Sequence, residues 1–147
     1  APPEGDSDFT IPFGVANIVK EGSDCTIVTA GRPVHFALEA AEALEAEGID
    51  CEVIDLRTYR PLDIETVVSR VKKTSYAVVV DQSWPFAGCA AEVASQIYEN
   101  AMDYLDNKVI RVNSDDVPPP YNRALEQEML PNARKIARAV REVTYNA

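Results

Sequence analysis

The densest group of polar side chains that could take part in chemistry is the stretch RTYRPLD, which follows an apolar run. Arg57 and Arg60 could hold an anion, because a guanidinium presents several hydrogen-bond donors in one plane. A small-anion site here would also use Gly31. The alternative is structural, with Asp63 capping the next helix, Pro61 stiffening the turn and the arginines pairing with local carboxylates. We favour the structural interpretation, because a phosphate-binding loop needs several glycines at fixed spacing.

The remaining candidates for chemistry are isolated. His35 is the only histidine, and Glu39 is the one carboxylate at ligand spacing on the same helical face, so a helix-surface or interface histidine is favoured over a base or metal ligand. Ser83 and Ser114 have no histidine or lysine base nearby in the sequence. We therefore expect no catalytic, cofactor-binding or metal-binding residue in this chain.

Two predicted loops carry large apolar side chains that would be exposed to water. The first is WPFAG, directly after the most apolar run, and the second is DDVPPPY, in which prolines fix the backbone beside an aromatic ring. Such side chains favour a surface that another polypeptide covers. The candidate interface residues are Trp84, Phe86, Pro118, Pro119, Pro120 and Tyr121.

Apolar periodicity predicts the elements that position these residues. Short β-branched runs alternate with amphipathic stretches of 10 to 15 residues, which indicates βαβ units and a mostly parallel sheet covered on both faces. Residues 1–13 show no period and are expected to form a linker or docking arm. We expect strands at 16–20, 25–30, 51–56, 76–81 and 108–113, and helices at 33–47, 63–73, 88–100 and 133–143.

Composition narrows the function classes. The chain has 147 residues, of which 46% are hydrophobic, and its formal net charge is -10. That charge repels phosphate backbones and anionic lipids, so it disfavours nucleic acid and membrane as partners, and it suits either a basic protein partner or mere solubility. No run approaches the length needed to span a bilayer. Cys25, Cys51 and Cys89 are expected to be buried free thiols in a reducing compartment.

The order of four motifs resembles one family along nearly the whole chain. The motifs are IPFGVANIVKEGSDCTIVTAGRPV, EAAEALEAEGIDCEVIDLRTYRPLD, VVVDQSWPFAGCAAEVASQI and YLDNKVIRVNSDDVPPPYN. They resemble the C-terminal domain of the beta subunit of pyruvate dehydrogenase, the thiamine-diphosphate-dependent first component of the 2-oxo acid dehydrogenase complexes. The resemblance implies a transketolase C-terminal-type domain over 14–147: three α/β/α layers around a mostly parallel, mixed, five-stranded sheet.

That resemblance implies an incomplete enzyme. In the family, an α2β2 tetramer decarboxylates pyruvate with thiamine diphosphate and magnesium and acetylates the lipoyl group of the transacetylase. The cofactor lies between the alpha subunit and the N-terminal domain of the beta subunit, and that domain is missing here. The resemblance therefore implies that this chain alone binds no cofactor and is inactive. It also implies the mitochondrial matrix, or alternatively the bacterial cytoplasm.

The resemblance also implies that this domain contacts other subunits of the complex. The family domain contacts the second beta subunit and the alpha subunits, and it docks the basic peripheral-subunit-binding domain of dihydrolipoyl transacetylase. The residues that match the docking positions are Asp106, in the YLD motif, and Ala147, through its carboxylate. A domain from a branched-chain or acetoin enzyme, a small-anion-binding domain and a generic acidic interaction module remain the alternatives.

Overall fold

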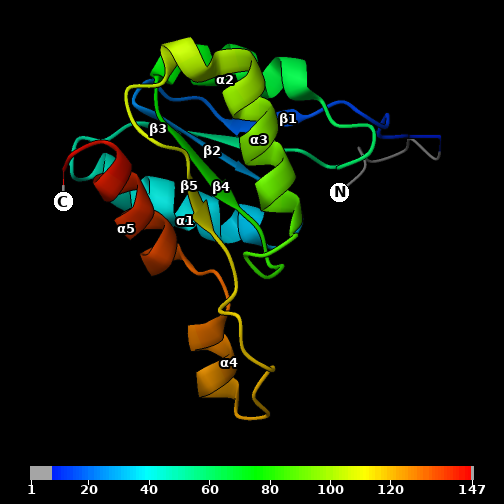
Figure 1. Ribbon diagram of the computed structural model, residues 1–147, viewed down its shortest axis with the longest axis vertical. Helices are drawn as coiled ribbons and strands as arrows, with labels where there is room; N and C mark the ends of the chain where they lie inside the picture. The colour runs from blue at the N-terminus through cyan, green and yellow to red at the C-terminus, as the bar shows by residue number, and fades with distance from the viewer. Residues whose placement is uncertain (1–7, 147) are drawn as a thin grey trace.

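A five-stranded sheet forms the centre of the computed structural model, which describes residues 8–146 (Figure 1). The strands are β1 (Asn17–Lys20), β2 (Cys25–Thr29), β3 (Cys51–Asp55), β4 (Ala77–Val80) and β5 (Ile110–Val112), in the order β1-β3-β2-β4-β5. β1 pairs antiparallel with β3, and all other pairs are parallel. The predicted mixed, mostly parallel sheet is therefore confirmed, with β1 and β5 as its edge strands.

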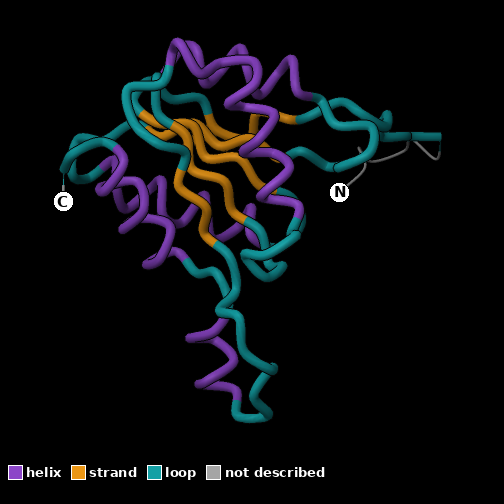
Figure 2. The backbone as a smooth tube through the Cα atoms, viewed as in Figure 1, coloured by secondary structure: helices purple, strands orange, loops and turns teal. Residues whose placement is uncertain are grey.

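Helices cover both faces of this sheet (Figure 2). α1 (Pro33–Glu45) and α5 (Ala133–Val143) pack on one face, and α2 (Ile64–Thr74) and α3 (Cys89–Ala101) pack on the other. A 3₁₀ helix, η1 (Met102–Tyr104), follows α3, and a short helix, α4 (Arg123–Met129), precedes α5. The three-layer α/β/α arrangement expected from the sequence is thus present.

Burial on both faces explains why the strands read as unbroken apolar runs. Every residue of β2 and β4 is buried. Alternate side chains enter separate cores: Ile27 and Val53 pack with α1 and α5, whereas Val28 and Ile54 pack with α2 and α3. A polar side chain introduced into β2 or β4 would replace apolar contacts on one face of the sheet and would remain buried away from water.

Three sequence-based expectations need correction. The sequence pattern did not predict α4, because only Met129 of its seven residues is buried and no apolar stripe marks it. Cys25 and Cys51 are buried as expected, but the prediction for Cys89 was wrong, since the first position of α3 faces solvent. Several predicted elements, such as the strand at 108–113, extend beyond the observed ones. Within residues 8–146, no helix is long and apolar enough to cross a membrane.

Candidate partner-binding site

The residues predicted to meet partners lie at two opposite ends of the sheet. Asp106 precedes β5 and therefore lies at the amino ends of the parallel strands, whereas Trp84 follows β4 and Pro118 follows β5, at the carboxyl ends. The two groups can therefore contact different partners at the same time.

The backbone of Asp106 is fixed on both sides while its carboxylate is exposed. Its N–H donates to the carbonyl of Ser75 at 3.0 Å, and Ser75 is the left-handed residue that ends α2. Its own carbonyl accepts from the Tyr145 hydroxyl at 3.1 Å. Because both backbone groups have partners in the fold, the charged side chain is left available for another molecule.

Three tyrosines lie near Asp106 in the fold or in the sequence, namely Tyr76, Tyr104 and Tyr145. The rings of Tyr76 and Tyr145 meet edge to face with centroids 6.4 Å apart. Burial, reinforced by the nearby Asp106 carboxylate, raises the pKa of the Tyr76 hydroxyl. The Lys72 ammonium lies 4.7 Å from the centroid of the Tyr104 ring. An exposed carboxylate with tyrosines nearby is chemically suited to an arginine or lysine of a partner.

The second predicted docking group, the carboxylate of Ala147, lies outside the described residues. Tyr145 is nevertheless in place against Asp106, 39 positions away in the sequence. The sequence pattern identified neither Tyr145 nor Tyr76 as part of this site, because nothing local links them to Asp106.

At the carboxyl ends, the buried Asp81 organises the loop that carries Trp84. Its carboxylate accepts from the N–H groups of Ser83 and Ala90, each at 3.2 Å, and from the Ser83 hydroxyl. It thereby joins the end of β4 to the start of α3. A Cβ on Gly88 would overlap Ser83 Oγ and the carbonyl of Trp84, so this close turn requires glycine.

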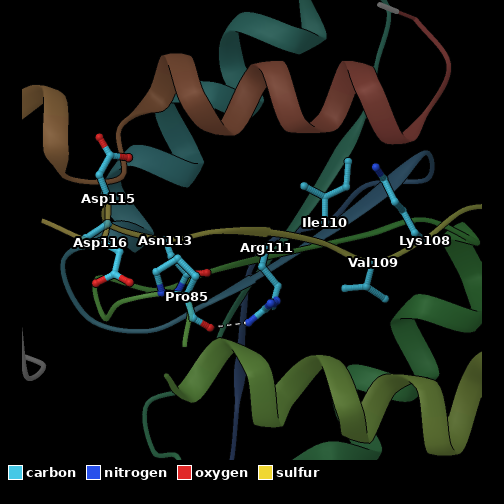
Figure 3. A pocket seen from close by; sticks show the side chains of 9 residues that line it. Pro85, Lys108, Val109, Ile110, Arg111, Asn113, Asp115 and Asp116 are labelled. Carbon is cyan, nitrogen blue, oxygen red and sulfur yellow. Dashed lines mark hydrogen bonds between the residues drawn. The ribbon is translucent and has the colours of Figure 1, made fainter. Parts of the chain in front are cut away.

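The same loop is fastened to the segment around β5. The Arg111 guanidinium donates to the Pro85 carbonyl at 2.8 Å, Ser114 Oγ donates to the Gln82 carbonyl at 2.6 Å, and Asn113 Nδ2 donates to the Ser83 carbonyl at 3.2 Å. Figure 3 shows Pro85 and Arg111 together at a cavity of about 580 Å³ beside β5.

This framework leaves the apolar tip of the loop in solvent. Trp84 is 51% exposed and Phe86 is 87% exposed. A fixed backbone below exposed rings is the arrangement expected of an interface that a partner covers.

The proline-rich loop belongs to a projecting hairpin-like segment, residues 115–130, here called the α4 arm (Figure 1). At its base, the Asp115 N–H donates to the Met129 carbonyl at 3.0 Å, and Lys135 Nζ lies 3.2 Å from both the Asp115 carboxylate and that carbonyl. Tyr121 is fully exposed, Pro118 and Pro119 are exposed, and Pro120 is half-buried. The predicted exposure of this loop holds except at Pro120, and its role as an interface stays a prediction.

The RTYRPLD stretch serves the fold. Asp63 accepts from the N–H of Thr66 at 3.1 Å, as the cap of α2, and from the N–H of Ala16 at 2.8 Å. Burial opposes ionisation of Asp63, but these hydrogen bonds outweigh it and lower the pKa of the carboxyl. Thr58 Oγ1 accepts from the Gly14 N–H at 2.9 Å. These bonds fix the segment that enters β1, which supports the structural role of Asp63. The predicted pairing of the arginines with local carboxylates was wrong, since within residues 8–146 neither Arg57 nor Arg60 forms an ion pair.

The anion-site alternative finds little support in the geometry. Arg60 lines a cavity of about 520 Å³ together with Glu92, whose carboxylate would repel an anion. Arg57 does not line that cavity, and the space around Gly31 is open. His35 lies exposed on α1, as predicted for a helix-surface residue. Among residues 8–146, no group of three or more histidine, cysteine or acidic side chains could hold a metal ion.

Residues 14–136 match the family model described as "Transketolase, C-terminal domain". The chain belongs to this family. Among solved structures, it is similar to a split-gene transketolase described as an inactive beta4 tetramer, with a TM-score of 0.77, 30% identity, and coverage of 98% of this chain and 46% of that one. This likeness agrees with the transketolase C-terminal-type fold that the sequence resemblance implied.

Within the transketolase C-terminal family, the chain is similar to subunits named "Pyruvate dehydrogenase E1 component subunit beta". It is 47% identical to that of Rickettsia felis over 135 residues, which cover 92% of this chain and 41% of the relative. It is 43% identical to the human mitochondrial subunit over 143 residues, which cover 96% and 40%. The predicted family resemblance is confirmed, and the chain spans about two fifths of these relatives' length.

Proposed function

We propose that this domain is the C-terminal assembly domain of a pyruvate dehydrogenase E1 beta subunit, and that it docks the transacetylase without contributing catalytic residues. Identity of 47% to a named beta subunit over 92% of the chain supports the enzyme assignment over the branched-chain and acetoin alternatives. The observation that carries the docking role is the exposed Asp106 carboxylate, whose backbone Ser75 and Tyr145 hold in place.

The proposed docking partner is the basic peripheral-subunit-binding domain of dihydrolipoyl transacetylase. An arginine of that domain would meet the Asp106 carboxylate and the exposed Tyr104 and Tyr145 rings. Charge-assisted hydrogen bonds and cation–π contacts both favour such a cation. The net charge of -10 would also attract a basic domain from a distance.

Isothermal titration with the isolated peripheral-subunit-binding domain tests the docking role. We expect Asp106→Ala to weaken binding by roughly tenfold or more, because it leaves a partner cation without its counter-charge. Asp103→Ala removes a neighbouring exposed carboxylate of η1 and serves as the control. No detectable binding by the unaltered chain, with its C-terminus verified by mass, would contradict the proposal.

We further propose that the exposed tip of the Trp84 loop and the α4 arm contact other subunits, either the alpha subunits or a second beta subunit. The exposed Trp84, Phe86 and Tyr121 support this role, and so does the tetramer named for the similar split-gene transketolase. On addition of alpha subunits, Trp84 fluorescence should shift to shorter wavelength, and Phe86→Ser should weaken that response. An unchanged spectrum in a mixture that co-sediments would place the contact elsewhere.

In this proposal, thiamine diphosphate and magnesium serve the whole enzyme and are not held by this chain alone. The acidic and histidine side chains of the described residues do not gather into a metal site, so no catalytic step is assigned to them. Purified chain supplied with thiamine diphosphate, magnesium and pyruvate should release no carbon dioxide above the protein-free rate. Turnover that stays with the chain through purification would refute this.

The compartment that we propose is the mitochondrial matrix, with the bacterial cytoplasm as the alternative. The human relative is named mitochondrial, which supports the first, whereas the relatives from Rickettsia felis and Rhizobium meliloti are bacterial and support the second. Locating the protein by fractionation of its source cells separates the two.

A further inference from the structure

We propose that the free edge of β5 pairs antiparallel with the same edge of a second copy, so that two sheets join across a two-fold axis. This inference rests on the proposed pairing of beta subunits and identifies the element that makes it. A two-fold axis requires a surface that is complementary to itself, and the segment KVIRVNSDD has this property, with a lysine at one end and two aspartates at the other.

The backbone of β5 leaves a short row of hydrogen-bonding groups facing away from β4. In a parallel pair, alternate residues direct both backbone groups toward the neighbouring strand. The Asp81 N–H donates to the Val112 carbonyl and the Ser114 N–H donates to the Ser83 carbonyl, so Val112 and Ser114 face β4 and the loop after it. Arg111 and Asn113 therefore direct their N–H and C=O groups outward.

At both ends of this row of outward backbone groups, the N–H group already has a hydrogen-bond partner within the chain. The Val109 N–H donates to the Tyr98 hydroxyl of α3 at 2.7 Å. At the other end, the Asp115 N–H donates to the Met129 carbonyl at 3.0 Å. Of the outward N–H groups from Val109 to Asp115, those of Arg111 and Asn113 are the ones left open, which limits the registers that a second strand can adopt.

One antiparallel register satisfies both the open groups and the charges. If Val112 lies on the two-fold axis, Arg111 of each copy pairs with Asn113 of the other, and Lys108 of each copy lies opposite Asp116. The register that instead places Arg111 opposite itself brings two guanidinium groups together, which is unfavourable. Lys108 pairs with Glu142 in the single chain, but both side chains are about half exposed or more, so this ion pair contributes little and can exchange.

The surface beside β5 has room for a neighbouring strand. Figure 3 shows the segment passing between α5 and α3, with Lys108 at one end and Asp115 and Asp116 at the other. A cavity of about 580 Å³ flanks it on the Pro85 side, and another of about 250 Å³ flanks it on the side of α5. Edge strands with unpaired backbone groups are templates for such pairing.

A charge-swap experiment on the purified chain tests the inference by sedimentation equilibrium. Lys108→Glu and Asp116→Lys should each raise the dimer dissociation constant by roughly tenfold, since each creates two like-charge pairs in one dimer. The double variant K108E/D116K restores opposite charges and should return the constant to nearly that of the unaltered chain. Arg32→Glu, before α1, and Glu65→Lys, on α2, make charge changes of the same size at exposed positions away from β5 and should leave the constant unchanged.

The outcomes separate this inference from the proposed function. A chain that stays monomeric at all concentrations, or a double variant that dimerises no better than the single variants, would overturn pairing through β5. A dimer that none of the variants weakens would also overturn it, while leaving assembly through another surface intact. Titration with the peripheral-subunit-binding domain tests docking through Asp106→Ala, a variant that leaves Lys108 and Asp116 in place, so each proposal has its own variant and its own measurement.

Discussion

Asp63 holds two segments in place with a single carboxylate. One oxygen caps α2 through Thr66, and the other accepts the N–H of Ala16 before β1. We expect Asp63→Ala to lower the free energy of unfolding by about 2 kcal/mol, because it removes a helix cap and leaves a second N–H without its partner. Urea denaturation measures the change. Asp63→Asn retains a capping oxygen and should lose less; a loss for alanine within about 0.5 kcal/mol, as for ordinary surface changes, would contradict this role.

Glu52 is the residue whose environment is least expected from its type. It is fully buried on β3, with Oε2 3.2 Å from Lys73 Nζ and 3.4 Å from Arg70, while Oε1 has no hydrogen-bond partner. Burial raises the pKa of Glu52. Interaction with the neighbouring Glu52 carboxyl, together with Arg70 and Lys73, lowers the pKa of the exposed Glu21.

The pH dependence of stability should reveal this buried acid. Because folding raises the pKa of Glu52, its contribution is present below the ordinary value of 4.5 and is lost as pH rises through the raised value. Glu52→Gln stays neutral, so its stability relative to the unaltered chain should increase as pH rises from about 4 to about 7. Glu21→Gln should change in the opposite direction, since the pKa of Glu21 is lowered. Thermal melts over this range that run parallel for all three proteins would contradict the assignment.

At the scale of elements, the apolar periodicity of the sequence predicted the helices and strands that bury apolar side chains. α5 was predicted with its observed bounds because Ile136, Val140 and their neighbours form a continuous buried stripe. The strands β2 and β4 were recognisable because both their faces are covered. α4 was not, because a helix exposed nearly all round has no apolar period, and it depends instead on the Asn122 side chain, which accepts from the N–H groups of Ala124 and Leu125.

The sequence could predict only those parts of the candidate site that are formed by residues close together in the chain. The loop that carries Trp84 and Phe86 was identified from its apolar residues, whereas Asp106 was identified from the family resemblance alone. The grouping of Asp106 with Ser75 and Tyr145 depends on where α2 and α5 end in space. The aspartate that ties the Trp84 loop to α3, Asp81, likewise acts across a turn whose shape Gly88 permits.

The clamp at the base of the α4 arm should control its opening. Lys135→Met removes the ammonium that joins the Asp115 carboxylate to the Met129 carbonyl. Loss of hydrogen bonds worth about 1 kcal/mol should speed amide hydrogen exchange in residues 116–128 roughly fivefold, without changing exchange in β2 or β4. Arg134→Met is the matched control, because its ion pair with Glu128 is well exposed and contributes little. Equal exchange in both variants would show that Lys135 does not hold the arm.

At the scale of the whole molecule, the surfaces proposed to meet partners lie at different parts of the sheet. Its amino ends present Asp106, its carboxyl ends present the Trp84 loop, and its β5 edge offers backbone groups. If all three surfaces are used as proposed, the Trp84 loop would meet its partner at the carboxyl ends, away from the partner that Asp106 would meet at the amino ends.

The net charge of -10 predicts how docking at Asp106 responds to salt. Raising ionic strength from about 0.1 M to about 1 M shortens the Debye length from about 10 Å to about 3 Å, which screens the attraction between an acidic domain and a basic partner. Affinity for the peripheral-subunit-binding domain should therefore fall steadily over this range. Asp106→Ala should show a shallower fall, because the charge nearest the partner is already gone, whereas Glu39→Ala on α1 should follow the unaltered chain. Affinity that is independent of salt would mean that apolar contacts, and not Asp106 and its surrounding charges, bring the two domains together.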